Sequence, residues 1–304
     1  MILVLGATGL LGSHVFSSLR KLNLPMRVMA RGGEDWQNPA SSNLRSRNVE
    51  VQFGDALDKT QLLKALDGCK AVVNAIGALT AKTNHELDAI NYETVANLVE
   101  LIPKSTVRRL VHVSCLGARE KSECEYLRAK WLAEQKVRET NIYWTIFRPS
   151  YLFGDTFPLY KLVEPMVKFR PFLPVLGSGL NVIQPVSAAQ VAECIVQSIY
   201  NRETVSKCFE LAGPKKYSVS DFMEMLRKKH NLSGPTLNVP LEVTAGAQNT
   251  LLKAIPVQWL TSDLAKLLTA ECATDQNDLE TTFGLKCQDL ETHLDTFLAS
   301  LPKK

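Results

Sequence analysis

Short apolar runs and amphipathic stretches alternate along the first half of the chain. Six runs are typical of buried strands, at residues 2–6, 26–31, 49–55, 71–77, 109–117 and 143–154. Between them, apolar residues recur at helical spacing at 9–22, 58–69, 86–102 and in the stretch that follows residue 124. Strands that alternate with helices form parallel βαβ units. The pattern therefore predicts an α/β fold with a doubly wound parallel sheet.

This alternation ends after residue 154, where prolines become frequent. Helical spacing returns at 188–201 and 218–230, a further strand is predicted at 207–214, and the remainder is expected to be helical with loops. We therefore expect a first domain over residues 1–154 and a smaller, mostly helical C-terminal cap or substrate region over 155–304. Elements near 182–214 are expected to return to the sheet of the first domain.

An apolar stretch at 157–177 has two interpretations. It carries Leu159, Leu162, Val163 and Met166 at helical spacing, next to Lys161 and other basic residues. Such a stretch suits a membrane surface or a protein partner. It equally suits a cap that covers a cleft with apolar side chains. The prolines in the stretch interrupt a long amphipathic helix, which favours the cap.

The composition narrows the class of protein. Apolar residues make up 45% and charged residues 22% of the 304 positions, which is ordinary for a folded globular chain. The net charge of +4 is mild and no long run of like charges occurs, so nucleic acid is not a predicted partner. The chain lacks an apolar run of about 20 residues, so no transmembrane segment is predicted.

The cysteines and the N-terminal residues indicate whether a metal site is expected and which cellular compartment suits the protein. The seven cysteines are an odd number without a C-x-x-C pair, and the five histidines are scattered. This pattern predicts neither a zinc site nor a disulfide framework, and it favours a reducing compartment. A strand that starts at residue 2 leaves no room for a signal peptide, which predicts a cytoplasmic protein. A mature chain with its presequence removed would fit the mitochondrial matrix equally well.

The stretch GATGLLG carries the first chemical signal. It places Gly6, Gly9 and Gly12 between a predicted strand and a predicted helix. Glycines there let the backbone turn tightly and approach a pyrophosphate, which the N–H groups and dipole of the helix start then bind. A second strand follows at the spacing of a dinucleotide-binding βαβ unit, which favours this interpretation over a tight turn without a ligand. The sheet is therefore predicted to be Rossmann-type.

The end of the second predicted strand indicates which nucleotide binds. An acidic residue there would bind the ribose 2′-hydroxyl of NAD(H), but this chain has Arg31, followed by Gly32 and Gly33. A guanidinium forms bidentate hydrogen bonds to phosphate oxygens, so the 2′-phosphate of NADP(H) fits better. The alternative is that Arg31 is an ordinary solvated surface residue. We expect NADP(H) rather than NAD(H).

The motifs together resemble a known family. GATGLLG, GDALD, VVNAIG, LVHVSCLGA, YLRAK and TIFRPSYLFG occur in the order seen in the short-chain dehydrogenase/reductase superfamily. The sequence is most similar to its extended and atypical branches. Within these it resembles the group that contains the NADPH-binding accessory subunit of respiratory complex I and its bacterial relatives, among them NmrA-like and NAD-dependent-epimerase-like proteins. The resemblance covers about residues 1–215.

The resemblance implies a set of cofactor contacts. Gly6, Thr8, Gly9, Leu10 and Gly12 would hold the pyrophosphate, and Arg31 would meet the 2′-phosphate. Other positions would contact the adenine, the riboses and the nicotinamide: Asp55 and Ala56; Asn74, Ala75 and Gly77; Lys130; and Pro149, Ser150 and Tyr151. Buried-core roles compete for Leu10, Ala56 and Ala75. Asn91 lies where many members have an asparagine that kinks a helix.

A catalytic centre is a further implication. Tyr126 and Lys130 lie four residues apart, on one face of the predicted helix. In active relatives such a tyrosine transfers a proton, the lysine lowers its pKa and holds the ribose, and a serine polarises the substrate carbonyl. Here the strand ends in Ser114 and then Cys115. If Cys115 occupies the position of the serine, the site has a poor hydrogen-bond donor.

Two functions remain open at this point. In the first, bound NADPH stabilises an accessory, assembly or redox-sensing protein, whose partner would be a respiratory or membrane-associated assembly. In the second, the chain is an NADPH-dependent reductase or dehydrogenase that uses Tyr126 and Lys130 on a small carbonyl, quinone or sterol-like substrate. The residues alone do not decide between the two.

Overall fold

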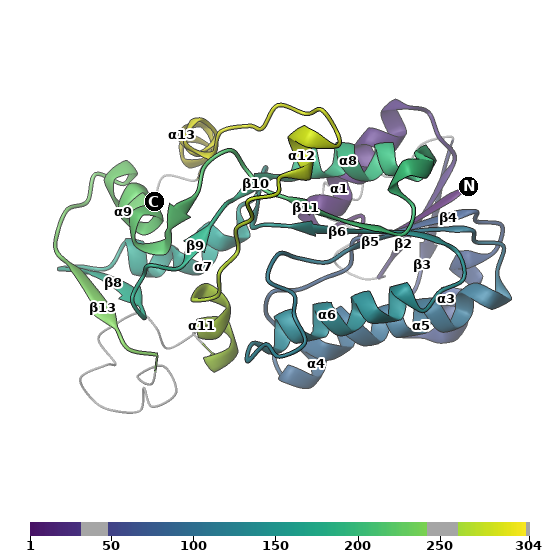
Figure 1. The fold of residues 1–304 in the computed structure, drawn as a ribbon, viewed down its shortest axis with the longest axis horizontal. Coiled ribbons are helices and arrows are strands. Elements are labelled where there is room, and N and C mark those ends of the chain that lie inside the picture. The colour runs from purple at the N-terminus through teal and green to yellow at the C-terminus, as the bar shows by residue number, and fades with distance from the viewer. Residues whose placement is uncertain (32–47, 242–260, 302–304) are drawn as a thin grey trace.

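A parallel sheet of seven strands forms the centre of the first half of the molecule. The computed structural model describes residues 1–31, 48–241 and 261–301. In these, the strand order is β11-β6-β5-β4-β1-β2-β3, with every neighbouring pair parallel. The strands span Ile2–Leu5 (β1), Met26–Ala30 (β2), Val49–Phe53 (β3), Ala71–Asn74 (β4), Arg109–Val113 (β5), Tyr143–Pro149 (β6) and Lys207–Leu211 (β11). The predicted α/β fold with a doubly wound parallel sheet is confirmed (Figure 1).

Helices cover both faces of this sheet. One face is covered by α1 (Leu10–Lys21) and α8 (Ala188–Tyr200), and the other by α3 (Lys59–Leu66), α5 (Thr94–Leu101) and α6 (Glu125–Arg138) (Figure 1). Each face has its own apolar core: Val15, Leu19 and Ile195 are fully buried on the first, and Leu62, Leu98 and Val137 on the second. Strands that are buried on both faces explain why the apolar runs in the sequence were nearly continuous.

Strand order reverses beside β1, which pairs with β4 on one side and with β2 on the other. Chain connections therefore diverge at the carboxyl ends of β1 and β4 and leave a crevice there. In open α/β sheets, ligands bind at such a switch point. The glycine loop follows β1 and the segment 75–78 follows β4, so both are positioned at this crevice by topology.

The predicted helix over 86–102 is interrupted. The structure has α4 (Asn84–Asp88), a π-helical turn at Ala89–Glu93, and then α5. Asn91 lies in this turn, and its side-chain amide donates to the carbonyls of Leu87 at 2.8 Å and Ala78 at 3.0 Å. Its Oδ1 accepts from the N–H of Ala78 at 3.2 Å. A side chain that occupies helical carbonyls in this way opens the helix locally and ties it to the loop after β4.

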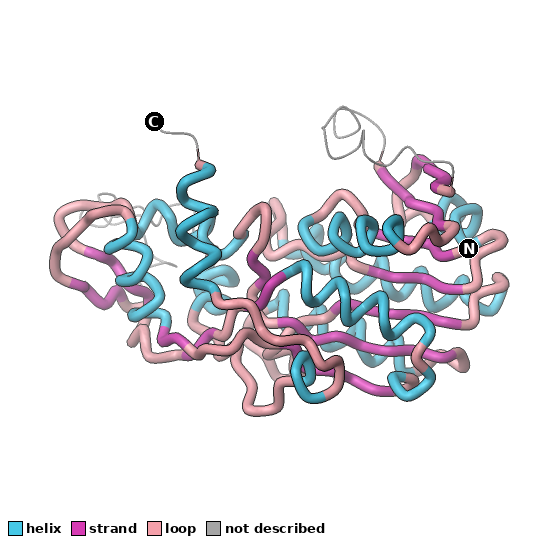
Figure 2. The backbone as a smooth tube through the Cα atoms, turned by 90° about the horizontal axis from the view of Figure 1, so that it is seen from above, coloured by secondary structure: helices cyan, strands magenta, loops and turns pink. Residues whose placement is uncertain are grey.

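The cap mixes helices and short strands. Its described helices are α7 (Pro158–Val167), α9 (Val219–Lys229), α11 (Ser262–Leu268) and α13 (Leu290–Ser300). Short strands accompany them: β8 (Leu173–Leu176) with β13 (Thr236–Val239), and β9 (Val182–Ile183) with β12 (Tyr217–Ser218). The first pair lies in stretches where no strand was predicted. Figure 2 shows the parallel sheet at one end of the molecule and the cap at the other. Gly32, Gly33 and residues 242–260 lie outside the described residues.

After residue 154 the chain comes back to the first half of the molecule, where one strand, β11, joins the seven-stranded sheet. Strand β10 (Val186–Ser187) pairs with β7 (Leu152–Phe153), α8 packs on α1, and β11 pairs with β6 at the sheet edge. Near the end, α12 (Asp278–Thr281) lies beside β11, where Asp278 accepts a 2.8 Å hydrogen bond from the N–H of Glu210. A domain boundary at residue 154 remains a prediction. None of the described helices has the length and apolarity that crossing a bilayer would require.

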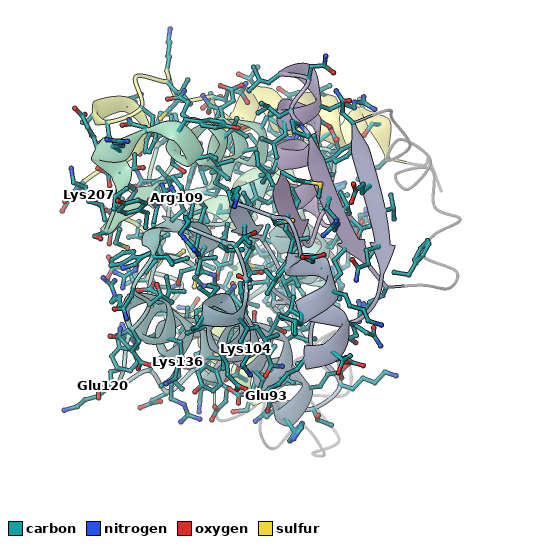
Figure 3. The ribbon with its side chains drawn as sticks, turned by 90° about the vertical axis from the view of Figure 1, so that its right-hand side faces the viewer. Glu93, Lys104, Arg109, Glu120, Lys136 and Lys207 are labelled. Atoms are coloured by element: carbon teal, nitrogen blue, oxygen red, sulfur yellow. The ribbon has the colours of Figure 1, made fainter. Side chains whose placement is uncertain are left out.

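A buried arginine joins several of these elements at the far end of the strands. Arg109, labelled in Figure 3, starts β5, and its Nη2 donates to Thr145 at 2.6 Å, to the carbonyl of Ser198 at 2.7 Å and to Thr204 at 2.9 Å. Burial lowers its pKa to about 10. Because Arg109 begins β5 and the candidate site follows the other end of that strand, we assign Arg109 a role in the fold and none in the site.

Candidate functional site

At two of its three glycines, the glycine loop is fixed by backbone contacts that leave no space for a side chain. Gly6 has φ +82°, and a Cβ there would lie 2.8 Å from the backbone of Ala75. A Cβ on Gly12 would lie 2.0 Å from the carbonyl oxygen of Gly6, so α1 begins directly against the loop. Gly9 differs, because a Cβ there would meet only the carbonyl of Gly6 at 3.4 Å. Gly6 and Gly12 therefore serve the turn, and Gly9 faces open space.

Two cavities meet at this loop. The first has a volume of about 460 Å³ and extends toward α6 and the cap. The second, of about 250 Å³, extends toward β2 and β3. Both are lined by Gly9 and by residues 75–78. The two cavities thus form one elongated site that bends around the start of α1.

The second cavity contains the residues expected around adenosine. Arg31 lies on its wall at the end of β2, and Asp55 and Ala56 line it after β3. The carboxylate of Asp55 accepts a 2.9 Å hydrogen bond from the N–H of Leu57, which holds the turn between β3 and α3. The wall also includes residues that the sequence had not indicated: Met29, Leu57, Ile76, Ile90 and Thr94. These sit at the ends of separate elements, so no motif reveals them.

Lys130 lies in the first cavity with its ammonium group buried. Its Nζ donates to the carbonyl of Val113 at 3.1 Å and to that of Ile76 at 3.4 Å. Burial lowers the pKa of this lysine. A Cβ on Gly77 would lie 2.9 Å from the same Nζ, so a side chain there would require the lysine to shift. The contacts hold a cation at the point where the two cavities join.

Tyr126 contacts Cys115 in the same cavity. The thiol of Cys115 lies near the hydroxyl of Tyr126, and each group influences the pKa of the other. Burial is the main reason that the pKa of Tyr126 is raised well above 10, and that the pKa of Cys115 is raised to about 12. Both groups are therefore protonated at neutral pH. A thiol thus occupies the place beside the tyrosine.

Ser114 also lines this cavity, but its hydroxyl is without a hydrogen-bond partner among the described residues. This hydroxyl is also buried. A buried hydroxyl without a partner is costly, so a ligand atom in the cavity would stabilise it. Ser114 and Cys115 therefore both line the cavity, and Cys115 also lies beside Tyr126.

The C-terminal segment closes one wall of the first cavity. Pro149, Ser150 and Tyr151 line the cavity after β6. The hydroxyl of Ser150 donates to the carbonyl of Cys272 at 2.8 Å, and that of Tyr151 donates to the carbonyl of Leu267 at 3.1 Å. These bonds connect positions more than a hundred residues apart in the chain. Their partners could not be identified from spacing.

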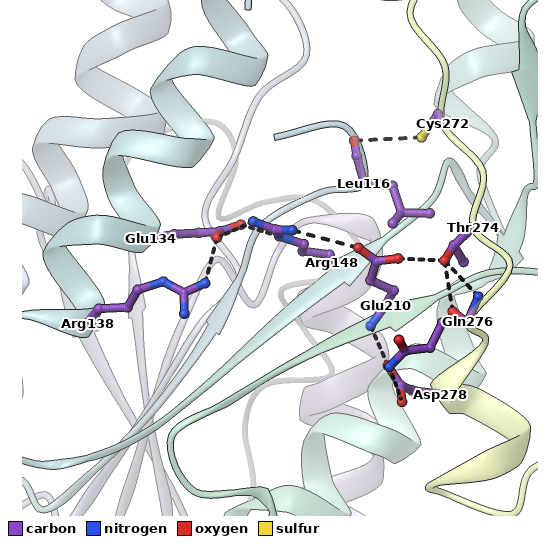
Figure 4. A network of polar contacts seen from close by, with 9 residues as sticks. All are labelled: Leu116, Glu134, Arg138, Arg148, Glu210, Cys272, Thr274, Gln276 and Asp278. Atoms are coloured by element: carbon purple, nitrogen blue, oxygen red, sulfur yellow. Dashed lines mark hydrogen bonds and ion pairs between the residues drawn. The ribbon is translucent and has the colours of Figure 1, made fainter. Parts of the chain in front are cut away.

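A buried ionic network fixes the helix that carries Tyr126 and Lys130. Glu134 of α6 accepts two hydrogen bonds from Arg148, at 2.8 and 2.7 Å, and one from Arg138 at 3.2 Å. Arg148 lies 3.7 Å from Glu210, which accepts from Thr274 at 2.5 Å (Figure 4). The network spans α6, β6, β11 and the C-terminal segment. It aligns the helix with the sheet beneath it.

Some predicted residues lie behind the site rather than on its wall. Asn74 is fully buried; its Oδ1 accepts from the N–H of Ile76 at 3.1 Å, and its amide nitrogen lies 3.4 Å from Nδ1 of His112. Asn74 therefore lines neither described cavity and instead shapes the loop after β4, and its place beside a ribose stays a prediction. Gly12 likewise supports the turn from behind. The other predicted contacts line a cavity: Gly6 and Thr8 the second, Leu10 the first, and Ala75 both.

The described residues hold no group of three or more histidine, cysteine or acidic side chains placed for a metal ion. The arrangement suits a different group. An elongated site, a helix start with a glycine turn and a buried lysine fit a dinucleotide with a pyrophosphate at its middle.

Comparison with known proteins supports a dinucleotide as the ligand of this site. The sequence matches the NAD(P)H-binding family over residues 6–202. The chain belongs to this family. The Rossmann fold, the nicotinamide cofactor and the resemblance to atypical short-chain dehydrogenases/reductases are thereby confirmed.

Its relatives include respiratory subunits and reductases. The chain is 30% identical to "NADH dehydrogenase [ubiquinone] 1 alpha subcomplex subunit 9, mitochondrial" of Arabidopsis thaliana, over 73% of this chain and 56% of that protein. It is 27% identical to a ceramide reductase of Caulobacter vibrioides, over 64% and 61%. It spans only 56–66% of the respiratory relatives that it matches. The structure of NADPH-dependent quinone oxidoreductase QOR2 with NADPH from Escherichia coli superimposes with TM-score 0.74, at 19% identity, over 98% of this chain and 100% of that one.

Proposed function

We propose that this chain binds NADP(H) across the two joined cavities and acts as a cofactor-holding subunit of a larger assembly. The observation that carries the proposal is that the cavities share Gly9 and residues 75–78, which makes one elongated site around a helix start. The pyrophosphate would lie at this junction, next to Gly6, Thr8, Gly9 and Leu10. The N–H groups and dipole at the start of α1 favour negative charge there.

The two cavities would hold the two ends of the nucleotide. The adenosine would occupy the second cavity, with Asp55 and Ala56 beside the base. Arg31 at its edge suits a 2′-phosphate, which supports NADP(H) over NAD(H). The nicotinamide riboside would occupy the inner part of the first cavity. There Lys130 would bind the ribose hydroxyls, and Pro149, Ser150 and Tyr151 would border the ring.

The holding role is supported by the thiol next to Tyr126. A thiol is a weak hydrogen-bond donor and would polarise a substrate carbonyl less than a hydroxyl does. The contacts of Lys130 serve binding whether or not the site is catalytic. The likeness to respiratory subunits supports a membrane-associated respiratory assembly as the partner. We assign the chain to the cytoplasmic side of such an assembly, or to the matrix in a mitochondrion.

A second function, reduction of a substrate, is supported by the size of the first cavity, which continues past Lys130 and Tyr126 to the cap. A reduced nicotinamide supplies a hydride when bound. Tyr126, which is protonated at neutral pH, would then donate its proton to the carbonyl oxygen of the substrate, although its raised pKa makes it a weaker acid than an exposed tyrosine. The partnerless hydroxyl of Ser114 would bind the ligand directly. Small carbonyls, quinones and sterol-like molecules are the substrates that we assign to this alternative.

Two measurements test these functions. Calorimetric titration of the purified chain with NADPH and NADH tests the cofactor site, and NADPH should bind more tightly. Absorbance at 340 nm, followed with a panel of carbonyls and quinones, tests the reductase. Tight NADPH binding with no substrate-dependent loss of absorbance supports the holding role, whereas steady turnover supports the alternative. Absence of binding to either nucleotide would overturn both.

A further inference from the structure

The part of the first cavity beyond Tyr126 and Lys130 is lined by leucines. They come from separate elements: Leu79, Leu116, Leu127, Leu159, Leu162 and Leu267. Leu127 is in the first turn of α6, Leu159 and Leu162 are in α7, and Leu267 is in α11. We name this part the leucine lobe. It is continuous with the position that the nicotinamide would occupy.

Charge is confined to the edge and the base of the cavity. Among the residues that line it, the charged side chains are Lys130, Lys161 and Glu271. Lys161 and Glu271 are exposed and of opposite sign. Lys130 lies on the cofactor side and is already bonded to two carbonyls. The leucine lobe itself therefore offers neither a net charge nor an array of hydrogen-bond donors.

We infer that the leucine lobe binds the hydrocarbon part of an uncharged, lipid-like molecule, whose polar end faces Tyr126 and Ser114. The inference rests on the proposed cofactor site, because the nicotinamide would form the inner wall. An aliphatic chain gains from leaving water in proportion to the apolar area that it buries. The partnerless Ser114 hydroxyl supplies a polar contact at the inner end.

The same lining argues against a nucleotide sugar, although some proteins of this fold bind one. A phosphate group buried in the lobe would lose its hydration without a paired cation. Lys161 and Glu271 both line the cavity and are exposed, and their opposite charges give its lining no net charge from this pair. Sugar hydroxyls would face leucine side chains and be left without partners. A neutral hydrocarbon chain with one polar group would lose neither the hydration of a phosphate nor the hydrogen bonds of sugar hydroxyls.

Binding of a ketone series tests the inference. The full chain, saturated with NADP⁺ so that no hydride can be transferred, is titrated calorimetrically with 2-butanone, 2-hexanone and 2-octanone. The association constant should rise about fourfold for each added methylene, until the lobe is full. Sodium octanoate and UDP-glucose are titrated in parallel, and both should bind more weakly than 2-octanone.

Substitutions at Leu162 and Leu180 test whether the ketones bind in the leucine lobe. Leu162 is partly buried on the cavity wall, so Leu162→Glu places a charge in the lobe and should weaken 2-octanone binding about tenfold or more. Leu180→Glu is the matched control, because Leu180 is 74% exposed and lines neither described cavity. It should bind 2-octanone as the wild type does. Leu162→Trp fills the lobe without adding charge and should shorten the longest ketone that binds, which keeps the test valid if Leu162→Glu does not fold.

The outcomes separate this inference from the cofactor proposal. NADP⁺ binding with no dependence on ketone length would overturn the leucine lobe as a hydrocarbon site and leave the cofactor proposal intact. Octanoate that binds more tightly than 2-octanone, or competition by UDP-glucose, would overturn the assignment of an uncharged ligand. Failure to bind NADP⁺ at all would remove the cofactor proposal, and with it the inference that rests on it.

Discussion

The carboxylate of Asp263 accepts a 2.5 Å hydrogen bond from the backbone N–H of Glu125, the first residue of α6. It also lies 3.4 Å from the N–H of Tyr126. The N-cap residue of α6 is Cys124, whose side chain makes no capping bond. Asp263 therefore caps the helix from a distant part of the chain, and its negative charge also suits the positive end of the helix. The same segment, α11, carries Leu267 on the cavity wall.

Asp263→Ala should therefore affect both stability and the site. Loss of a helix cap costs about 1 kcal/mol of unfolding free energy, measurable by urea denaturation. The matched control is Asp289→Ala, which removes the cap of α13, where Asp289 accepts from the N–H of Thr292 at 2.9 Å. Both variants should lose similar stability, but only Asp263→Ala should weaken NADPH binding, because α6 carries Lys130. Equal NADPH affinity in the two variants would show that the cap does not position the site.

Gly9 and Gly12 should respond differently to added side chains. A Cβ at Gly12 would lie 2.0 Å from the carbonyl oxygen of Gly6, so Gly12→Ala should strongly destabilise the fold. Gly9 has extended backbone angles and space for a Cβ, so Gly9→Val should leave a folded chain. It should nevertheless lose NADPH, because the side chain would occupy the pyrophosphate position. Thermal shift with and without NADPH measures both effects, and a normal NADPH shift in Gly9→Val would rule out this loop as the phosphate site.

Arg31 should determine the choice of nucleotide. Arg31→Asp should weaken NADPH more than NADH, by a few kcal/mol at most, which is on the order of one charge-assisted pair. Arg119→Asp makes the same charge change at an exposed position that lines neither described cavity, and it controls for the overall field. Calorimetry with both nucleotides gives the comparison. Equal losses for NADPH and NADH would remove Arg31 from the 2′-phosphate role.

His112 should make stability depend on pH. It is fully buried behind the site, and burial, with a smaller contribution from the charge of Lys130, holds its pKa well below 6.5. The unfolded chain takes up a proton at this residue below about pH 6.5, whereas the folded chain does not. The free energy of unfolding should therefore fall as pH drops from 6.5 toward the folded pKa, by up to about 1.4 kcal/mol per pH unit.

Urea denaturation between pH 7.5 and 5.0 measures this slope. His112→Asn removes the titrating group and should flatten the slope by the contribution of one proton, whatever it costs at pH 7.5. His85→Gln replaces an exposed histidine of α4 and should keep the wild-type slope. An unchanged slope in His112→Asn would mean that the buried imidazole is not the source of the pH dependence.

Periodicity predicted the sheet well and the cap poorly. The central strands of the sheet, such as β1, β4 and β5, are buried on both faces, so their apolar runs stand out in the sequence, and the glycine loop identifies the first βαβ unit. The pair β8 and β13 was missed because Leu173–Leu176 is four residues long and contains a proline. Its partner lies some sixty residues later. Such pairings depend on tertiary contacts and leave little local signal.

The residues of the site divide in the same way, into those with a local sequence signal and those that depend on tertiary contacts. Residues in local motifs, such as Gly9, Arg31 and Lys130, were predicted at positions that line the cavities. Residues that act across the chain were not, and Asp263 and Leu267 belong to this second class. Asn74 was expected beside a ribose from the family resemblance, whereas its amide group contacts the loop after β4 and His112. A sequence gives the end of a strand more reliably than the direction of a polar side chain.

The two proposed functions differ in what they require of Lys130 and Tyr126. Lys130 would bind the ribose in either case, so Lys130→Ala should weaken NADPH binding in both. The substitution Tyr126→Phe removes only one hydroxyl. It should therefore leave the NADPH affinity within a factor of about three of the wild-type value. If the chain is a reductase, the same change should lower turnover by about 10²–10⁴-fold, the loss expected for a general acid. If it only holds the cofactor, no turnover exists to be lost.

Cys115→Ser gives the complementary test. A hydroxyl at this position is a better donor than the thiol and fits the same space. Turnover of a carbonyl or quinone should rise by up to about 10²-fold, because one more donor stabilises the developing negative charge on the substrate oxygen. Double replacement, Cys115→Ser with Tyr126→Phe, should abolish that gain, since the serine acts together with the proton donor. Turnover that survives Tyr126→Phe in either background would show that Tyr126 is not the proton donor, and the reductase mechanism built on it would fail. A chain that stays inactive as Cys115→Ser, while it still binds NADPH tightly, would identify the thiol as incidental and favour the cofactor-holding role.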